Sequence, residues 1–413
     1  MARIAVVGAG PAGSLAAGML ADLGHEVVLL DRRNDPTEPA RDGRATPLAL
    51  HVRGRRAIAA AGDELLSAGV GGTSVVLARR IVHGPDGSTV ISETPEDRRG
   101  RSIARHDLSA ALFRWARTRP RVEVRLGTTC LNVSRSRRQV ELRGPEGHQA
   151  EESFDAVIGA DGAASEVRWA VARMPSVDIA KVTSPWGYAE VIIGADEGRH
   201  RLDGDAVHVW PGRSIFLFAL PQVDGTFTCT LYARHADWPV SGYQVIHGLP
   251  SGEPIDLDRL GERYPEAWPH LVGPSLENIR NGLKTVQAVR VDALDDGGWI
   301  ALIGDAGHAM TPYLGQGVNL ALEDAVELAR RIGPPGGDLP AAIRAYGKDR
   351  HPEGIGAADL SDLGVRLYTQ MPFAGPDPLA MTVGALNMGE LRHSDAARMW
   401  IPGWRPVVQP ERG

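Results

Sequence analysis

A glycine-rich turn between a strand and a helix near the start of the chain constrains the fold most. Residues 3–7 have the β-branched character of a buried strand, and the apolar positions of residues 11–23 share one helical face. Residues 26–30 predict a second strand. The turn between the first strand and the helix, Gly8-Ala-Gly-Pro-Ala-Gly13, has the GxGxxG spacing. The sequence therefore predicts a βαβ unit of the dinucleotide-binding type.

Each glycine of this turn has a distinct expected role. Gly8 permits the tight turn, Gly10 lets a pyrophosphate approach the backbone, and Gly13 lets helix and strand pack closely. A GxGxxG spacing alone is weak and can mark a purely structural turn, but Asp31 ends the second strand at the distance expected of a ribose-binding carboxylate. The predicted contacts here are Gly8, Gly10, Ala12, Gly13, Asp31 and Arg32.

Two later motifs have the same strand–turn–helix character. In the first, an apolar strand expected over 154–159 leads into Asp161-Gly162 and a polar segment; alone, this would suggest only a turn with a solvated carboxylate. In the second, residues 304–319, Asp305 follows an apolar strand and a Gly-Gln-Gly turn opens a helix. Such a helix start presents free N–H groups and a positive dipole end, which suit an anionic cofactor.

Size and composition narrow the class of protein. The 413 residues exceed one typical core, so two or three lobes are expected. A net charge of −6 does not suggest nucleic-acid binding, and two distant cysteines give neither a zinc spacing nor a disulfide framework. No apolar run approaches the roughly 18 residues that span a bilayer. We expect a soluble, cytoplasmic protein without a metal site; the oligomeric state is not indicated.

The pattern changes between about 176 and 280. Residues 206–210, 214–220 and 226–232 are short runs rich in β-branched and aromatic residues, and Asp224-Gly225 predicts a hairpin between the last two. Together with residues 75–91, they predict a second lobe around a β-sheet. Trp210 and Phe218 either line a pocket for an aromatic ring or pack within the sheet.

The three motifs occur in the order GxGxxG, GADGxxSxxR and GDAxHxxxPxxGQGxN. This set resembles the single-component, FAD-dependent aromatic hydroxylases typified by p-hydroxybenzoate hydroxylase. The resemblance implies an α/β fold: a Rossmann-like FAD-binding domain of that type, a β-sheet substrate domain and a C-terminal helical segment. The expected boundaries are 1–72, 100–175 and 281–345 for the FAD-binding domain, 73–99 and 176–280 for the substrate domain, and 346–413 for the helical region.

The same resemblance implies cofactors and contacts. FAD would be reduced by NADPH or NADH, and O₂ would supply the hydroxyl group through a flavin C4a-hydroperoxide. Asp161 would serve both FAD and NADPH, Asp305 would bind the ribityl chain, and the helix beginning at Gly317 would face the flavin edge that becomes negative on reduction. The further implied FAD contacts are Arg105, Cys130, Val318 and Asn319.

Segments at 48–57, 187–190, 208–211, 227–231 and 359–361 look like the kynurenine 3-monooxygenase branch. Arg80 matches the arginine that holds the substrate carboxylate there, but Thr94 stands where a tyrosine is expected. Gly364 replaces an asparagine and His393 a second tyrosine. Each lost hydrogen bond to a charged group costs about 1.5–3 kcal/mol. The affinity for kynurenine should therefore be low. We expect Arg80, Thr94 and His393 to bind instead a small tryptophan- or kynurenine-like or aminobenzoyl compound of secondary metabolism.

Two alternatives remain open from the sequence. The first is kynurenine 3-monooxygenase activity itself. The second is a non-hydroxylating use of the same fold, as an oxidase, a reductase, a halogenase or a binding protein similar to the GDP-dissociation inhibitors. Residues 399–402 contain only part of the WxWxIP segment of flavin halogenases, and a binding protein would not explain the Gly-Gln-Gly turn.

Overall fold

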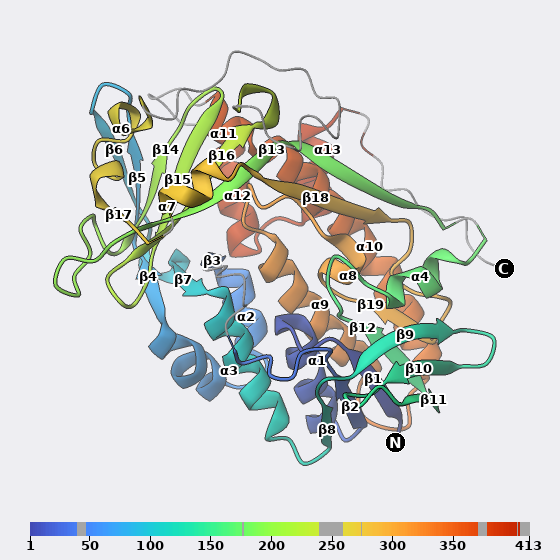
Figure 1. The fold of residues 1–413 in the computed structure, drawn as a ribbon. Coiled ribbons are helices and arrows are strands. Elements are labelled where there is room, and N and C mark those ends of the chain that lie inside the picture. Colours follow the sequence, from blue (N-terminus) through green and yellow to red (C-terminus); the bar gives the residue numbers. More distant parts are fainter. Residues whose placement is uncertain are drawn as a thin grey trace.

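The chain forms two large sheets joined by helices. The computed structural model describes residues 1–38, 47–175, 177–238, 259–273, 275–370, 378–402 and 404. Within these ranges the strands form four sheets, one of five strands, one of eight and two of three. Figure 1 shows the large sheet at the top of the view and the five-stranded sheet at the bottom, with the helices between and beside them.

The five-stranded sheet is parallel throughout and contains the predicted βαβ unit. Its order is β19-β12-β1-β2-β8, so the chain runs outward in one direction through β2 and β8 and returns to the other side for β12 and β19. The carboxyl ends of β1 and β12 therefore flank the point at which the strand order reverses, where such sheets bind ligands. The strands are β1 (Arg3–Val7), β2 (Glu26–Leu30), β8 (Val122–Arg125), β12 (Ala156–Gly159) and β19 (Ile300–Leu302).

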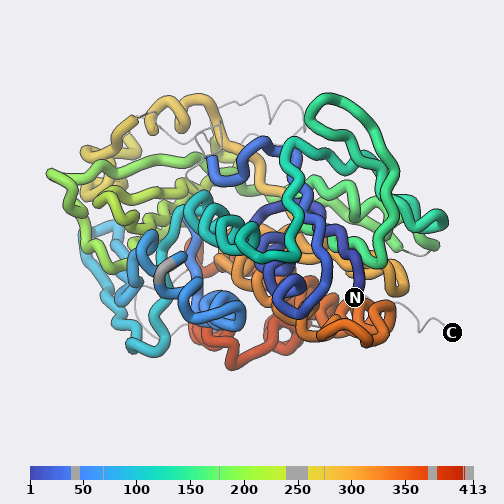
Figure 2. The backbone as a smooth tube through the Cα atoms, turned by 90° about the horizontal axis from the view of Figure 1, so that it is seen from below, coloured from blue at the N-terminus to red at the C-terminus, as the bar shows by residue number. Residues whose placement is uncertain are grey.

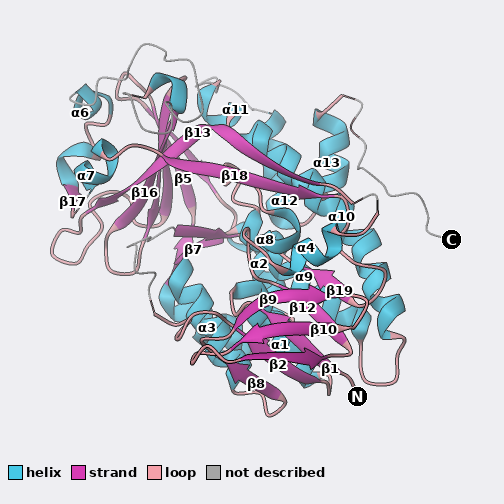
Figure 3. Cartoon of the chain, turned by 45° about the vertical axis from the view of Figure 1, so that its right-hand side comes forward, coloured by secondary structure: helices cyan, strands magenta, loops and turns pink. Residues whose placement is uncertain are grey.

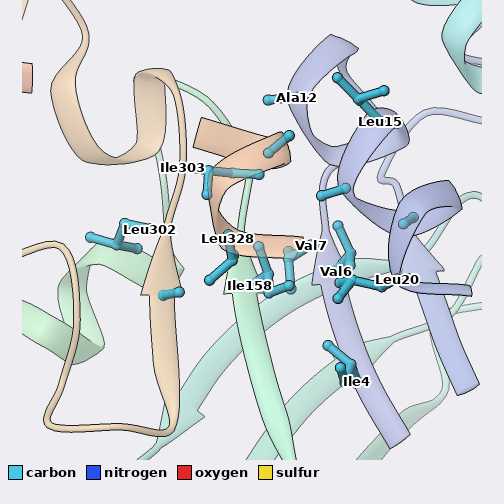
Figure 4. Packing of buried hydrophobic residues seen from close by; sticks show 14 of the residues in the cluster. Ile4, Val6, Val7, Ala12, Leu15, Leu20, Ile158, Leu302, Ile303 and Leu328 are labelled. Carbon is cyan, nitrogen blue, oxygen red and sulfur yellow. The ribbon is translucent and has the colours of Figure 1, made fainter. Parts of the chain in front are cut away.

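Helices α1 (Pro11–Asp22) and α3 (Arg105–Arg117) pack on this sheet, and α9 (Gly317–Ile332) packs on α1. Figure 4 shows apolar side chains of the sheet, such as Val6 and Ile158, close to Leu15 of α1 and Leu328 of α9. All four side chains are fully buried. This core fixes the starts of α1 and α9 next to the carboxyl ends of β1 and β19.

The sequence pattern with Asp107 as a cap predicts a helix over 108–117, but the helix begins three residues earlier. α3 starts directly after the strand β7 (Gly100–Ala104), and Asp107 lies in its first turn rather than before it. An acidic residue stabilises the first turn through the helix dipole as well as a cap would, so the position of Asp107 misplaced the boundary. Arg105 thus becomes the first helical residue.

The eight-stranded sheet confirms the predicted second lobe. The hairpin at Asp224-Gly225 is present, with the Gln222 N–H donating to Thr226 O at 2.8 Å and Gly225 at φ 85°. The strands are β5 (Arg79–His83), β6 (Thr89–Glu93), β13 (Ile179–Ile193), β14 (Ala206–Trp210), β15 (Ile215–Pro221), β16 (Phe227–Arg234), β17 (Leu271–Val272) and β18 (Lys284–Val291).

Two strands pair with a domain other than the one to which the sequence assigned them. β18 pairs with β13 of the large sheet, although the FAD-binding part was expected to resume at residue 281. β4 (Ser74–Leu77) pairs with β7 in a small sheet with β3 (Pro47–Leu50), although it was placed in the substrate domain. The other small sheet, seen beside the parallel sheet in Figure 3, comprises β9 (Thr129–Ser134), β10 (Gln139–Arg143) and β11 (Gln149–Ser153).

Helices dominate the C-terminal part, as predicted. The long helix α10 (Leu339–Gly364) packs on α9 and is followed by α11 (Arg366–Thr369), α12 (Pro378–Met388) and α13 (His393–Trp400). Figure 2 shows the first strand and helix, in blue, beside the orange segment near residue 335; His25 Nε2 lies 2.9 Å from Gly333 O there. The remaining helices are α2 (Val52–Ala59), α4 (Val167–Ala172), α6 (Leu260–Arg263), α7 (Ser275–Arg280) and α8 (Asp305–His308).

Residues 34–47 are rich in Pro, Asp, Arg and Thr, which predicts a long loop; this segment lies in part outside the described residues, which exclude 39–46. Within the described ranges, no helix combines the length and the apolar character required to cross a bilayer.

Candidate active site

The first and second motifs touch at the carboxyl ends of β1 and β12. Gly8 has φ 107°, and a Cβ atom there would lie 2.7 Å from the carbonyl carbon of Ala160 and 2.9 Å from Asp161 Cα. A Cβ at Gly13 would collide with the carbonyl oxygen of Gly8, whereas one at Gly10 would meet no protein atom within 4 Å. Gly8 and Gly13 therefore serve packing, and Gly10 leaves the backbone open to a ligand.

The third motif closes on the first through Gly304. This residue has φ 58°, and an added Cβ would lie 2.9 Å from Ala321 Cβ and 3.6 Å from Ala12 Cβ. Its N–H donates to the buried Asp324 carboxylate of α9 at 3.0 Å. The peptide before Asp305 is thus held between α1 and α9.

Arg168 joins the second motif to the third. Its guanidinium is almost fully buried and donates to Ala306 O at 2.9 Å and to Ala163 O at 2.6 Å. Asp161 accepts from the N–H of Glu166 at 2.7 Å and from Ser165 Oγ at 2.5 Å, so it holds the start of α4. The serine and arginine of the GADGxxSxxR pattern therefore build the framework around Asp161.

Asp305 and Arg105 face each other across the site, with 3.8 Å between the carboxylate and the guanidinium. Next to them, α9 begins at Gly317 with no acidic residue in its first turn and with Arg330 and Arg331 in its last. The free N–H groups and the positive dipole end of this helix are therefore available to an electron-rich group. Gly317 and Val318 line the cavity there.

Asn319 fixes the shape of this helix start instead of lining the cavity. Its fully buried amide donates to Ala49 O at 3.0 Å and to Gly315 O at 2.9 Å, and its Oδ1 accepts from the N–H of His51 at 2.9 Å. A side-chain contact between Asn319 and a cofactor is therefore not supported; the residue holds the 49–51 segment against the Gly-Gln-Gly turn.

Asp31 is buried and already well supplied with hydrogen-bond donors. Its carboxylate accepts from the N–H of Ala9 at 2.7 Å and from Arg33 through the backbone N–H, Nε and Nη2, each at 2.9 Å. Burial raises the pKa of Asp31, but the hydrogen bonds and the charge of Arg33 outweigh burial and lower it overall. The carboxylate is therefore ionised at neutral pH and can accept ribose hydroxyls only in competition with Arg33.

One cavity of about 1040 Å³ runs along all of these elements. This volume is at the upper end for small-molecule sites and suits a dinucleotide together with a second ligand. The predicted site residues that line it are Gly8, Gly10, Ala12, Asp31, Arg32, Arg80, Thr94, Arg105, Cys130, Asp161, Asp305, Gly317 and Val318. Gly13, Asn319 and His393 do not line it.

Cys130, on β9, is a neutral part of the cavity wall. Burial raises the pKa of its thiol to about 12, and the nearby carboxylates of Asp161 and Glu166 add to the effect. The thiol therefore offers shape and not nucleophilic chemistry, which depends on the thiolate.

The far end of the cavity is aromatic. Phe216 lies between Tyr232 and Tyr368, with ring centroids 4.9 and 5.0 Å apart and nearly parallel planes. Phe218 meets Tyr368 edge-on, and Tyr313 meets Tyr232 in the same way. Burial raises the pKa of the three tyrosines, which therefore remain neutral phenols. This wall suits a flat aromatic ligand.

Arg80 and Thr94 lie together at this aromatic end, on or next to the paired strands β5 and β6. The neighbouring Arg79 is committed to Asp203 and Asp205, with 2.7 Å and 2.5 Å between charged atoms. Among the described residues, no side chain forms an ion pair with Arg80. Arg80 is thus the guanidinium available to an anionic ligand.

His393 is not where the sequence analysis placed it. Its side chain is completely buried behind the Gly-Gln-Gly turn, between Glu353, Arg53 and Gln316, and it does not line the cavity. Burial lowers the pKa of His393 to about 4, so the imidazole is neutral. Direct substrate contact by His393 is therefore wrong, because α13 places its first residue inside the protein.

Trp210 and Phe218, treated alike in the sequence, have different roles. Phe218 lines the cavity, whereas Trp210 is buried on the other face of the sheet and stacks on His83 at 4.2 Å. The register decides this: Phe218 pairs with Val209, and Trp210 pairs with Leu217. Directly paired residues share a face, so Trp210 and Phe218 point to opposite sides.

Other cavity residues were missed from the sequence. His51 lines the cavity with its Nε2 buried and without a partner among the described residues, and burial lowers its pKa to about 4. Tyr313 and Leu314 sit within the third motif and could have been proposed from their position next to the Gly-Gln-Gly turn. For Tyr368 and Asn387, in the C-terminal helices, no local signal exists.

Comparisons with known proteins agree with this geometry. A model of the family described as "FAD binding domain" matches residues 1–360. Kynurenine 3-monooxygenase of Salinispora arenicola is 36% identical over 369 residues, which cover 87% of this chain and 78% of that protein. Kynurenine 3-monooxygenase of Salinispora tropica is 35% identical over 368 residues, with the same coverage.

A solved structure, the tetrameric form of 2-methyl-3-hydroxypyridine-5-carboxylic acid oxygenase, matches at a TM-score of 0.69 and 22% identity. The match covers 94% of this chain and 97% of that chain and supports the fold. Fold and site together define an FAD-dependent monooxygenase of the p-hydroxybenzoate hydroxylase type. The chain belongs to the FAD binding domain family and, within it, to the kynurenine 3-monooxygenase-like branch.

Proposed function

We propose that the protein hydroxylates an activated aromatic ring with FAD, O₂ and NADPH or NADH, and that its substrate is a tryptophan- or kynurenine-like or aminobenzoyl compound of secondary metabolism. The observation that carries this proposal is the single cavity with two different ends. One end is backbone-lined and meets the three nucleotide motifs; the other is aromatic and contains an available arginine.

The residues of the first end fit FAD. Gly10 would admit the pyrophosphate, Asp31 and Arg32 would lie by the ribose, and Cys130 would lie by the adenine. Asp305 and Arg105 would hold the ribityl chain, and the start of α9 at Gly317 would stabilise the electron-rich edge of the ring system. FAD, when bound, supplies the redox chemistry that activates O₂.

The second end supports an anionic aromatic substrate. The phenylalanine and tyrosine rings would hold a flat ring and exclude water, and Arg80 would pair with a carboxylate. Thr94 lies near Arg80 in place of the tyrosine expected of kynurenine 3-monooxygenases, which favours a substrate other than kynurenine. The alternative, kynurenine itself, is favoured by the names of relatives at 35% and 36% identity.

The test is a substrate panel on the purified protein. Flavin content is measured first, and then L-kynurenine, L-tryptophan and anthranilate are each added with NADPH or NADH in air. We expect bound FAD, nicotinamide oxidation stimulated by one of these compounds, and a product heavier by one oxygen atom. Efficient kynurenine hydroxylation would establish the alternative; H₂O₂ formation without a hydroxylated product, or a protein without flavin, would contradict the proposal.

A further inference from the structure

One polar residue lies on the cavity face of the C-terminal helix α12. Ala380, Val383 and Asn387 line the cavity and are spaced by three and four residues, so they share one face of the helix. Ala380 and Val383 offer only apolar contact. Asn387 is half-buried, and its amide carries both a donor and an acceptor. Whether the donor or the acceptor of this amide points into the cavity determines which ligand groups the site can bind.

The neighbouring Gln316 determines the orientation of Asn387. The side-chain nitrogen of Gln316 lies 3.0 Å from the carbonyl oxygen of Leu314 and 2.7 Å from Asn387 Oδ1. A backbone carbonyl can only accept, so the Gln316 atom beside Leu314 must be the NH₂ group. This group donates its second hydrogen to Asn387, so the Asn387 atom that faces Gln316 must be the oxygen, which accepts.

The other end of the Gln316 amide contacts His393. Gln316 Oε1 lies 3.1 Å from His393 Nε2, so Nε2 must carry the imidazole proton. Arg53 Nη1 lies beside both ring nitrogens of His393, 3.2 Å from Nδ1 and 3.1 Å from Nε2, so this contact is compatible with either tautomer. The tautomer of His393 is therefore set by Gln316, which requires the proton on Nε2.

Gln316, His393 and Arg53 form a chain of polar contacts behind Asn387, which we call the relay, and they cannot easily rearrange. Gln316 and His393 are almost completely buried, and Arg53 is nearly so. Arg53 is fixed by Glu323, with 2.7 Å between Nε and Oε1, and the backbone N–H of His393 donates to Glu353 Oε2 at 2.9 Å. Turning the Asn387 amide would set two NH₂ groups against each other, which buried amides avoid.

We propose that Asn387 is a substrate-binding residue that donates from Nδ2 to a carbonyl or carboxylate oxygen on the substrate ring, next to the Gly-Gln-Gly turn. Within the described part of the chain, no acceptor pairs with Nδ2. Gln316, His393 and Arg53 are positioning residues that fix this donor. The inference rests on the proposed function, since it assigns a specificity group within the same cavity.

The binding test compares two probes that share one ring. Anthranilate carries a carboxylate acceptor, and aniline is the same amine without it; binding is followed through the absorbance change of the flavin. In Asn387→Leu, we expect the dissociation constant of anthranilate to rise about tenfold, and in Asn387→Asp by more, because two carboxylates repel. Aniline should bind both variants as it binds the wild type. Met381→Ala, on the exposed side of α12, is the matched control.

Equal anthranilate binding by the wild type and Asn387→Leu would overturn the proposal, as would the failure of anthranilate and L-kynurenine both to bind the wild-type holoprotein. A wild type that binds anthranilate through Asn387 without ever hydroxylating an aromatic ring would sink the proposed function alone.

A second measurement reads the relay without any ligand. In ¹⁵N-histidine-labelled protein, His393 should be a neutral imidazole with its proton on Nε2, assigned by the loss of its signals in His393→Gln. A proton on Nδ1 would reverse every donor in the relay and overturn the proposal. His393→Gln should retain anthranilate binding better than His393→Leu, because only the glutamine side chain can still donate to Gln316.

Discussion

The two ends of the cavity are built from different materials. The FAD end is lined mainly by backbone and small residues. Gly8, Gly10 and Gly304 allow close approach to the backbone, and helix starts supply N–H groups. At the aromatic end, side chains from β15, β16, the loop before α9, α11 and α12 meet, and each comes from a different segment. The first end is a rigid property of the fold, and the second is adjustable by substitution.

This contrast predicts that framework substitutions at the FAD end have the largest effects on stability. Asp324→Asn should lower the free energy of unfolding by about 3 kcal/mol, because the buried Arg350 would lose its nearer carboxylate partner and keep only Glu323, at 3.4 Å. Arg350 Nε lies 2.8 Å from Asp324 Oδ1, and the carboxylate also holds the Gly304 N–H. Urea unfolding measures the change.

Asp349→Asn is the matched control for this framework effect. Asp349 pairs with Arg331 near the surface and should change the free energy of unfolding by about 0–1 kcal/mol. Equal losses in Asp324→Asn and Asp349→Asn would contradict the distinction between framework and surface.

The glycine turn offers a sharper pair of substitutions. Gly8→Ala should destabilise the fold by about 1–3 kcal/mol, because φ 107° is unfavourable for alanine and its Cβ would press on Ala160 and Asp161. Gly10→Ala should leave the free energy of unfolding unchanged, since its Cβ meets no protein atom, yet it should weaken FAD retention. Thermal unfolding and flavin content separate the two effects, and an unstable Gly10→Ala would argue against an open backbone there.

At the aromatic end, substitutions should affect binding rather than stability. Arg80→Gln should weaken anthranilate binding by about 1.5–3 kcal/mol, because a charge-assisted hydrogen bond is lost, without a change in unfolding. Arg79→Gln should instead lower the free energy of unfolding and leave anthranilate binding unchanged, since Arg79 pairs with Asp203 and Asp205. Titration followed by flavin absorbance measures the first effect and urea unfolding the second. Unchanged anthranilate affinity in Arg80→Gln would remove Arg80 from the site.

The smallest expected effect is a pH dependence of stability in the large sheet, which is absent at neutral pH and develops in acid. His83 and His208 are buried, 3.0 Å apart between ring nitrogens, and burial lowers the pKa of His83 to about 4. Because the unfolded chain binds a proton near pH 6.5 and the folded protein does not, stability falls as the pH drops from 6.5 towards 4.

His83→Gln removes this titration while keeping a donor towards His208. Its free energy of unfolding should therefore fall less steeply with acidification, by up to about 1.4 kcal/mol per pH unit in that window. Parallel pH profiles for His83→Gln and the wild type would show that His83 is not buried as a neutral group.

The same contrast explains how much could be predicted from the sequence. Each of the three motifs of the FAD end is contiguous in sequence, and its chemistry follows from glycine spacing and helix starts. Gly10, Asp161 and Asp305 could therefore be predicted as cofactor contacts, and all three line the cavity. Arg168, the arginine of the second motif, supports them as framework, and Asp324 does so from a buried position that the sequence pattern did not reveal.

The aromatic end depends on information that one sequence does not contain. The strands around Trp210 and Phe218 were predicted, but the register that sends these side chains to opposite faces is a tertiary property. His393 was taken for a substrate ligand from its place in a pattern, whereas the packing of α13 buries it behind Gln316. Asn387 reaches the cavity only because α12 packs beside the Gly-Gln-Gly turn, which is a tertiary contact.

The central claim is that one continuous cavity brings FAD and an aromatic ring together for oxygen transfer. The most direct measurement is a turnover of the flavin-loaded protein under ¹⁸O₂ with NADPH and the panel compound that best stimulates its oxidation. We predict a product that carries one ¹⁸O atom on its aromatic ring. A product without the label, or consumption of ¹⁸O₂ solely to labelled hydrogen peroxide with every compound, would contradict the account.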